Sequence, residues 1–343
     1  MSSFLGKISE KYVSLSSQVD VYRNIKGYKF NYMLSYEDEI SLYNKICSSF
    51  YKLYYSDRFY FEKIDLQSNM FNLDVDTVFK LIDEWNKMGI LNNKGLFLDS
   101  NDIFRENSYI ASRDDGFVYM NINIKEHLRL TGKLPGVNYF RCGHFAYGLE
   151  ADLDEKIKFS FNTNFGYIFE DLNLVGNGLK MTGVLHIPSL RYYKTTDFLE
   201  KKLASLGIKI YSLLSIGLCE DFYIVEFCNE NSEEFSAIRK MDKYITEIVN
   251  LEIDNRRKLL GIKTDYFREK FEKYRSILMN RENVTPYIVT KYISLCILLQ
   301  SLELIVEYDL KLLYESLMTV RSSVFLNEEE QNEELLKVIL KLI

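Results

Sequence analysis

Apolar and polar residues follow two different spacings in the first two thirds of the chain. Alternation with a period of two predicts strands over 117–124, 156–162, 181–187, 208–214 and 221–228. Apolar residues three and four positions apart predict helices over 36–54, 74–88 and 196–206, and a glycine follows the last two of them. This mixture of antiparallel-type strands and helices predicts an α+β layer structure.

The pattern changes after Cys228, because no strand-like alternation follows it. Amphipathic runs at helical spacing succeed one another over 232–259, 264–279, 286–306, 309–321 and 328–342. We therefore predict an all-helical C-terminal domain that begins between residues 245 and 265. As domains we take residues 1–250 and 251–343.

Composition narrows the classes of function. The chain has 343 residues, 47% of them hydrophobic, and a formal net charge of −6. No block of lysine and arginine is present, which argues against nucleic acid or an anionic membrane as a partner. No apolar run reaches the length of a signal peptide core or a membrane span. The five cysteines are scattered without a CxxC spacing, so we expect free buried thiols and a cytoplasmic protein.

One segment, Phe165 to Pro188, carries more information than the others. Its framework residues, among them Gly166, Gly176 and Gly178, occur in the order and spacing of the signature segment of the phosphagen (guanidino) kinase family, which it resembles without a gap. Residues 16–30, 104–112, 123–129 and 223–240 resemble further conserved segments of that family. A glycine pair alone would be an ordinary turn signal; the flanking matches make the resemblance specific.

The resemblance implies a guanidino-kinase catalytic-type domain, an antiparallel sheet flanked by helices, followed by the helical domain. It is strongest to the bacterial protein-arginine kinases. That branch implies an ATP:guanidino phosphotransferase that uses ATP and Mg²⁺ and forms a dimer. It also implies a protein partner, either an active arginine kinase or a Clp-type protease system.

The positions that carry the family's chemistry are mostly substituted. Where the family binds nucleotide phosphates with arginine, this chain has Gln18, Asp20 and Lys180. The acid that holds the substrate guanidinium is replaced by Lys125, and the reactive cysteine by Asp171. Glu170 stands beside Asp171 as a possible second acid, while Arg23, His127 and Arg129 retain the family's residue types. The histidines show no metal-ligand spacing, so no metal site is expected within the protein itself.

These substitutions weaken the expected reaction. Phosphoryl transfer depends on cations that neutralise the triphosphate and on anions that orient the guanidinium. A charge-assisted hydrogen bond is worth about 1.5–3 kcal/mol, so two lost arginines remove about 3–6 kcal/mol. We therefore interpret the chain as a degenerate arginine-kinase homologue, a pseudokinase with a regulatory or scaffolding role. Two alternatives stay open: an active phosphotransferase with a rebuilt site, and a module that binds a nucleotide or phosphoarginine without turnover.

Overall fold

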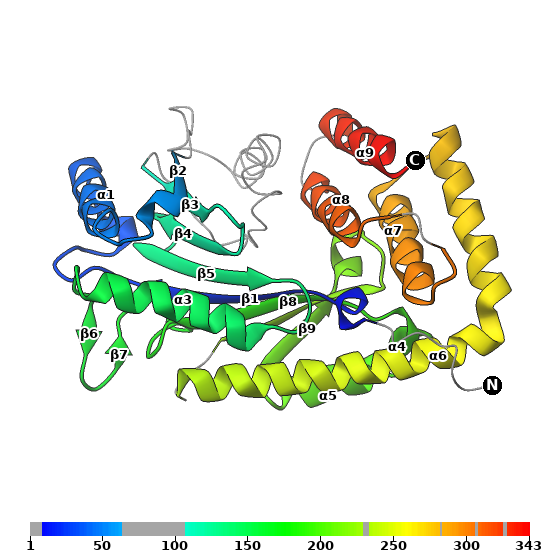
Figure 1. Ribbon diagram of the computed structural model, residues 1–343, viewed down its shortest axis with the longest axis horizontal. Helices are drawn as coiled ribbons and strands as arrows, with labels where there is room; N and C mark the ends of the chain where they lie inside the picture. Colours follow the sequence, from blue (N-terminus) through cyan, green and yellow to red (C-terminus); the bar gives the residue numbers. More distant parts are fainter. Residues whose placement is uncertain (1–8, 64–106, 229–232, 282, 306–307, 325–327) are drawn as a thin grey trace.

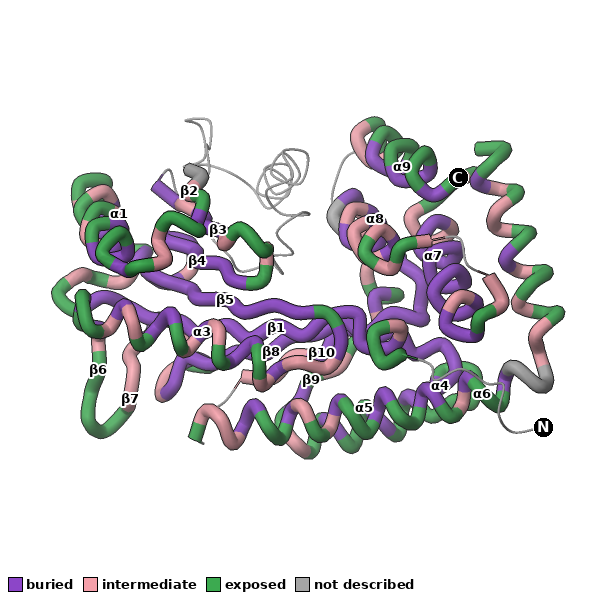
Figure 2. The backbone as a smooth tube through the Cα atoms, viewed as in Figure 1, coloured by how far each residue is buried: buried purple, intermediate pink, exposed green. Residues whose placement is uncertain are grey.

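The computed structural model describes residues 9–63, 107–228, 233–281, 283–305, 308–324 and 328–343. Its centre is an eight-stranded sheet in the order β2-β3-β4-β5-β1-β8-β10-β9, in which every neighbouring pair is antiparallel. The strands are β1 Ser14–Arg23, β2 Phe59–Lys63, β3 Tyr109–Arg113, β4 Val118–Ile122, β5 Leu128–Leu134, β8 Leu179–His186, β9 Ile208–Ser212 and β10 Phe222–Cys228. All ten residues of β1 are buried, so this central strand is covered on both faces (Figures 1 and 2).

Helices cover one face of the sheet. α3 (Tyr139–Asp154), α5 (Thr196–Ala204) and the first half of α6 (Glu234–Asn280) pack on it through a shared apolar core. α3 comes very close to β5, because a Cβ on Gly132 would lie 2.1 Å from the carbonyl oxygen of Cys142. A glycine is therefore required at this helix–strand contact. Asp242 of α6 accepts hydrogen bonds from the backbone N–H groups of Tyr139 and Phe140, both at 2.9 Å, and so caps the N-terminus of α3.

Helix α1 (Tyr36–Phe50) packs beside strands β3 to β5. Its inner side shares an apolar core with these strands and with α3. α1 begins with a capping box, in which the Ser35 hydroxyl accepts from the backbone N–H of Asp38 at 3.2 Å. A short hairpin of β6 (Phe161–Asn162) and β7 (Gly166–Tyr167) projects away from the sheet (Figure 1).

The C-terminal helices are α7 (Pro286–Ser301), α8 (Leu310–Ser323) and α9 (Glu328–Leu342), packed beside the second half of α6. Their core also includes Leu15, Val184, Phe222 and Ile224 of the sheet. The predicted division at residue 250 falls inside α6, which continues without interruption to a non-helical residue at Lys263. The helical bundle is thus joined to the sheet by a continuous helix and by a common core.

Most predicted elements are present. The helix predicted over 36–54 and the helix predicted over 196–206 are α1 and α5, and four of the five strands are β4, β8, β9 and β10. The strand predicted over 156–162 is wrong: only Phe161–Asn162 pairs as a strand, and Phe159 forms an isolated bridge with Ile25. The runs 232–259 and 264–279 form one kinked helix. The helix predicted over 74–88 lies outside the described residues.

Two further features bear on the predicted class of protein. Within the described ranges, no helix combines the length and the apolar composition needed to cross a membrane. All five cysteines are free; four are buried, and Cys228 is partly buried.

Candidate functional site

The face of the sheet opposite α3 carries polar side chains on its central strands. Val19 and Val21 of β1 point into the apolar cores beneath the helices, so Gln18 and Asp20 point to the other face. The register places Asp20 between Thr131 of β5 and Lys180 of β8. Three positions that the resemblance assigns to phosphate binding, Gln18, Asp20 and Lys180, therefore lie on neighbouring strands of one face.

Asp20 is the centre of a fully buried cluster on this face. Its carboxylate accepts hydrogen bonds from Arg129 through Nε (3.1 Å) and Nη2 (3.3 Å). The Thr131 hydroxyl and the Gln18 amide also donate to it, at 2.6 Å and 2.9 Å. The guanidinium of Arg129 thus binds a carboxylate of its own chain through two N–H groups, the geometry with which arginine also binds phosphate.

A second ion pair joins Lys125 to Asp171, with 2.8 Å between Nζ and Oδ2. Each side chain is about one fifth exposed. Burial alone would raise the pKa of Asp171, but hydrogen bonds from Lys125 and Asn173 outweigh it, and the pKa is lowered. The pair connects the segment before β5 to the signature loop between β7 and β8. An ammonium group of the chain itself therefore lies against the acid that stands at the position of the family's reactive cysteine.

A third ion pair joins Lys180 to Glu226 at 3.1 Å, and Lys209 lies 3.8 Å from the same carboxylate. These residues line a cavity of about 210 Å³ together with both members of the second ion pair. Its walls are formed by Tyr22, Lys125, Asp171, Asn173, Leu174, Lys180, Gly207, Lys209, Glu226 and Cys228. Burial raises the pKa of the Cys228 thiol to about 11, so it is protonated and unreactive at neutral pH.

The signature loop keeps its shape through its glycines. Tyr167 and Gly176 exchange backbone hydrogen bonds of 2.8 and 3.2 Å, which close the loop. Gly178 has φ +63°, and a Cβ there would lie 2.5 Å from the ring of Phe169 and 2.6 Å from the carbonyl oxygen of Tyr22. Any side chain at this position would clash with the loop and with β1. The retained glycines are thus required by the backbone, whatever the loop binds.

Three other predicted site residues lie elsewhere. Arg23 is buried beneath the signature loop, where it donates to Glu150 and to the carbonyl of Asn177 at 2.8 Å and stacks on Tyr167. His127 accepts from the backbone N–H of Ile25 through Nδ1 (2.9 Å), and its Nε2 lies 2.7 Å from the carbonyl of Lys29. Both residues connect backbone segments and do not face the cavity. Glu170 is exposed and does not line the cavity either.

The sequence reasoning did not single out Glu126, which lies between Lys125 and His127. Its buried carboxyl accepts from Asn24 Nδ2 at 2.6 Å and from the backbone N–H of Asp171 at 3.4 Å. Burial raises its pKa to about 7 despite these hydrogen bonds. The sequence did contain a signal for Glu126, because the family segment that residues 123–129 resemble also has an acid at this position. Nothing in the residue pattern, however, predicted that the carboxyl is buried.

Glu126 should make the stability of the protein depend on pH. Its pKa is higher in the folded state than in the unfolded chain, so the folded state binds the additional proton. The stabilisation is complete below about pH 4.5 and is lost as the pH rises through about 7. We expect the free energy of unfolding of Glu126→Gln to decline less than that of the wild type between pH 5 and 8, by up to about 3 kcal/mol. Urea denaturation across this pH range measures it, and identical profiles for the two proteins would contradict the assignment.

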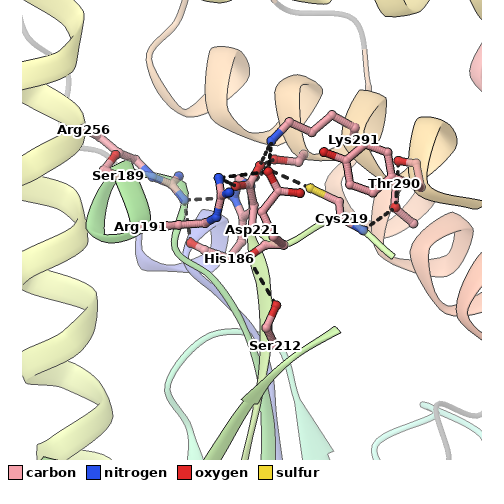
Figure 3. A network of polar contacts seen from close by, with 12 residues as sticks. His186, Ser189, Arg191, Ser212, Cys219, Asp221, Arg256, Thr290 and Lys291 are labelled. Carbon is pink, nitrogen blue, oxygen red and sulfur yellow. Dashed lines mark hydrogen bonds and ion pairs between the residues drawn. The ribbon is translucent and has the colours of Figure 1, made fainter. Parts of the chain in front are cut away.

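A second buried polar cluster lies where the sheet meets the C-terminal helices (Figure 3). Asp221, at the start of β10, accepts hydrogen bonds of 2.7 Å from both Lys291 and Ser294 of α7. His186 at the end of β8 contacts Ser294 through Nε2 and Arg256 through Nδ1, each at 2.9 Å. Burial, together with the charge of Arg256, lowers the pKa of His186 well below its usual value, so the imidazole stays neutral. This cluster ties α6 and α7 to two central strands and is separate from the cavity.

Comparison with known proteins places these observations in a family. A family model described as the C-terminal catalytic domain of ATP:guanido phosphotransferase matches residues 61–255, more than half of the chain. A protein-arginine kinase of Desulforamulus reducens is 25% identical over 71% of this chain, which spans 64% of that relative's length. A protein-arginine kinase of Clostridium perfringens is 23% identical over 92% of this chain and 89% of its own.

Solved structures agree on the fold. The duplicated taurocyamine kinase of Schistosoma mansoni, with bound components of a transition-state analogue, superposes with a TM-score of 0.57 at 17% identity, over 73% of this chain and 34% of that one. A lombricine kinase gives 0.54 at 15% identity, over 75% of this chain and 69% of its own. Together with the antiparallel sheet, its covering helices and the glycine-built signature loop, the family match shows that this chain belongs to the ATP:guanido phosphotransferase family.

Proposed function

We propose that this protein is a non-catalytic member of its family, which acts by binding a protein partner. The observation that carries the proposal is the pairing of the site's cations with carboxylates of the same chain. Arg129 binds Asp20, Lys125 binds Asp171, and Lys180 binds Glu226. These three cations, which lie at positions that could contact a phosphate or a guanidinium, therefore each have a partner of opposite charge within the chain.

The donor set does not fit a magnesium triphosphate. Asp20 would face phosphate oxygens with like charge, and Arg129 is bound to it. The cavity of about 210 Å³ is smaller than the 300–1,000 Å³ typical of small-molecule sites. Mg²⁺ would add positive charge, but it would not remove the carboxylates from the phosphate-binding positions. We therefore derive no phosphoryl-transfer step for this chain.

The ion pairs also account for the retention of the fold without its chemistry. Arg129 is nearly fully buried and Lys125 is only one fifth exposed, so leaving either charge unpaired would be costly. Carboxylates at Asp20 and Asp171 supply the missing counter-charges, so the site stays folded without a ligand. A scaffold that binds partners needs this stability and does not need turnover. By resemblance to its relatives, the proposed partner is an active protein-arginine kinase or a protease system that such a kinase serves.

Two measurements on the full chain test the proposal. The first is calorimetric titration with Mg·ATP; the second is incubation with Mg·ATP and an arginine-rich protein, followed by assay of acid-labile phosphate. An active protein-arginine kinase such as the Clostridium perfringens relative serves as the positive control. We expect neither binding heat nor transfer from this protein. Transfer that disappears in Asp171→Ala would overturn the proposal, and binding without transfer would replace it with a nucleotide-binding module.

A further inference from the structure

β9 forms one edge of the sheet. It pairs with β10 on its inner side, from Ile208 opposite Phe227 to Ser212 opposite Tyr223, and the described part of the chain places no strand on its outer side. An edge strand of this kind presents backbone N–H and C=O groups that can pair with another extended segment. The two faces of this edge differ in character, and the difference indicates what such a segment would look like.

One face of the edge borders an apolar groove between β9, β10 and the first turns of α6. A cavity of about 180 Å³ opens there, lined by Leu206, Ile208, Phe227, Ala237, Lys240, Met241 and Tyr244. Leu206, Phe227 and Tyr244 are partly exposed, whereas Ile208 and Met241 form the buried floor. Lys240 is exposed at the rim. The groove can therefore receive apolar side chains, with a positive charge at its margin.

The other face of the same edge is positively charged. Lys209 points away from the groove and toward the cavity of the candidate site, and its side chain is 74% exposed. Glu226 is the carboxylate near it, but Glu226 is also 3.1 Å from Lys180, so one acid is shared between two lysines. Positive charge is thus left over at this face, on a chain whose overall charge is negative.

We propose that the β9 edge binds an extended segment of a partner protein in which apolar and acidic side chains alternate. Successive residues of a strand point to opposite faces of the sheet. A segment added to β9 would place every second side chain in the apolar groove, and the residues between them beside Lys209. Charge complementarity with Lys209 selects an acidic partner over a second copy of this chain, which would present a lysine of its own. This surface deepens the proposed partner-binding role, but its test does not depend on whether the protein binds ATP.

The probe is a fluorescein-labelled octapeptide that alternates valine and glutamate, titrated into the full chain and followed by fluorescence anisotropy. We expect saturable binding that weakens about tenfold in Lys209→Glu and in Tyr244→Ala. Lys243→Glu is the matched control: it makes the same charge change at an exposed position on α6 that does not line the groove. An octapeptide that alternates valine and lysine should not bind.

Hydrogen exchange distinguishes strand addition from other modes of binding. The valine–glutamate peptide should slow amide exchange within residues 208–212. Three results would overturn the proposal: absence of saturable binding, equal binding of the valine–lysine peptide, or binding that both Lys209→Glu and Tyr244→Ala leave unchanged. Protection of 208–212 that rises with protein concentration in the absence of peptide would assign the edge to a second copy and would also overturn it. Because none of these readouts involves nucleotide, they are independent of the phosphotransfer assay.

Discussion

Replacing Asp221 with alanine is expected to lower the free energy of unfolding by about 3–5 kcal/mol, the cost of breaking a buried ion pair from one side. Asp221 is 3% exposed and balances the charge of Lys291, which is itself buried among α7 and β10. Burial opposes the ionisation of Asp221, but Lys291 outweighs it and lowers the pKa of the carboxyl to about 2. Without the carboxylate, the lysine would keep its desolvation cost and retain only the longer contact of 3.3 Å with Glu220 as counter-charge.

Urea denaturation at pH 7 measures this effect. Asp254→Ala is the matched control, since Asp254 forms only an exposed ion pair with Arg257 on α6, and its loss should cost no more than about 1 kcal/mol. The double variant Asp221→Ala/Lys291→Met should recover part of the lost stability, because it removes both charges together. A single variant as stable as the wild type would show that the cluster does not hold the helices to the sheet.

Replacing Asp20 with alanine should have a comparable cost and should also create an anion site. The variant leaves the guanidinium of Arg129 buried without its carboxylate, which we expect to cost about 3–5 kcal/mol. Asp20 is the direct neighbour of Lys180, which lines the cavity, so the truncation extends the cavity toward Arg129. Inorganic phosphate could then replace the missing carboxylate.

Thermal denaturation with and without phosphate is the measurement. At phosphate concentrations about tenfold above its Kd, binding to the variant would contribute about 1.4 kcal/mol and raise Tm by about 2 °C. The wild type should show no such rise, because Asp20 already fills this role. Chloride at equal ionic strength controls for screening, and Asp114→Ala controls for the loss of a carboxylate from an exposed pair with Arg58. An equal response of the wild type to phosphate would contradict the self-occupied site.

The spacing of apolar residues predicted those helices and strands that keep one periodicity along their whole length. β8 and β10 alternate or run apolar over their whole length, and α1 combines helical spacing with an N-terminal capping box. The break predicted between 259 and 264 appears as the kink at Lys263 within α6. α3 was not predicted, because Gly143 and Gly148 interrupt its apolar spacing. Gly143 marks a close approach to α6, where a Cβ would lie 2.6 Å from the Cδ1 atom of Ile238.

For the candidate site, too, the sequence revealed some features and only the structure revealed others. The resemblance predicted which positions differ from the family's residue types, because a substitution is visible one residue at a time. It could not show that the replacements pair with each other, since Asp20 and Arg129 are 109 residues apart and Lys125 and Asp171 are 46 apart. Glu226 and Glu126 were overlooked for the same reason. Their importance comes from the strand register and from burial.

By itself, the sequence determined the family and the signature loop, and it predicted that the phosphate-binding arginines are replaced. These depend on residue identity and short spacing, and Gly178 shows why: its backbone conformation admits no other residue without a clash. Only the tertiary structure decided that Arg129, Lys125 and Lys180 each pair with a carboxylate, that Arg23 and His127 support backbone segments, and that the β9 edge separates an apolar groove from a basic face. The physical reason is that ion pairs and cavities form between strands distant in sequence, where sheet register sets which charges meet.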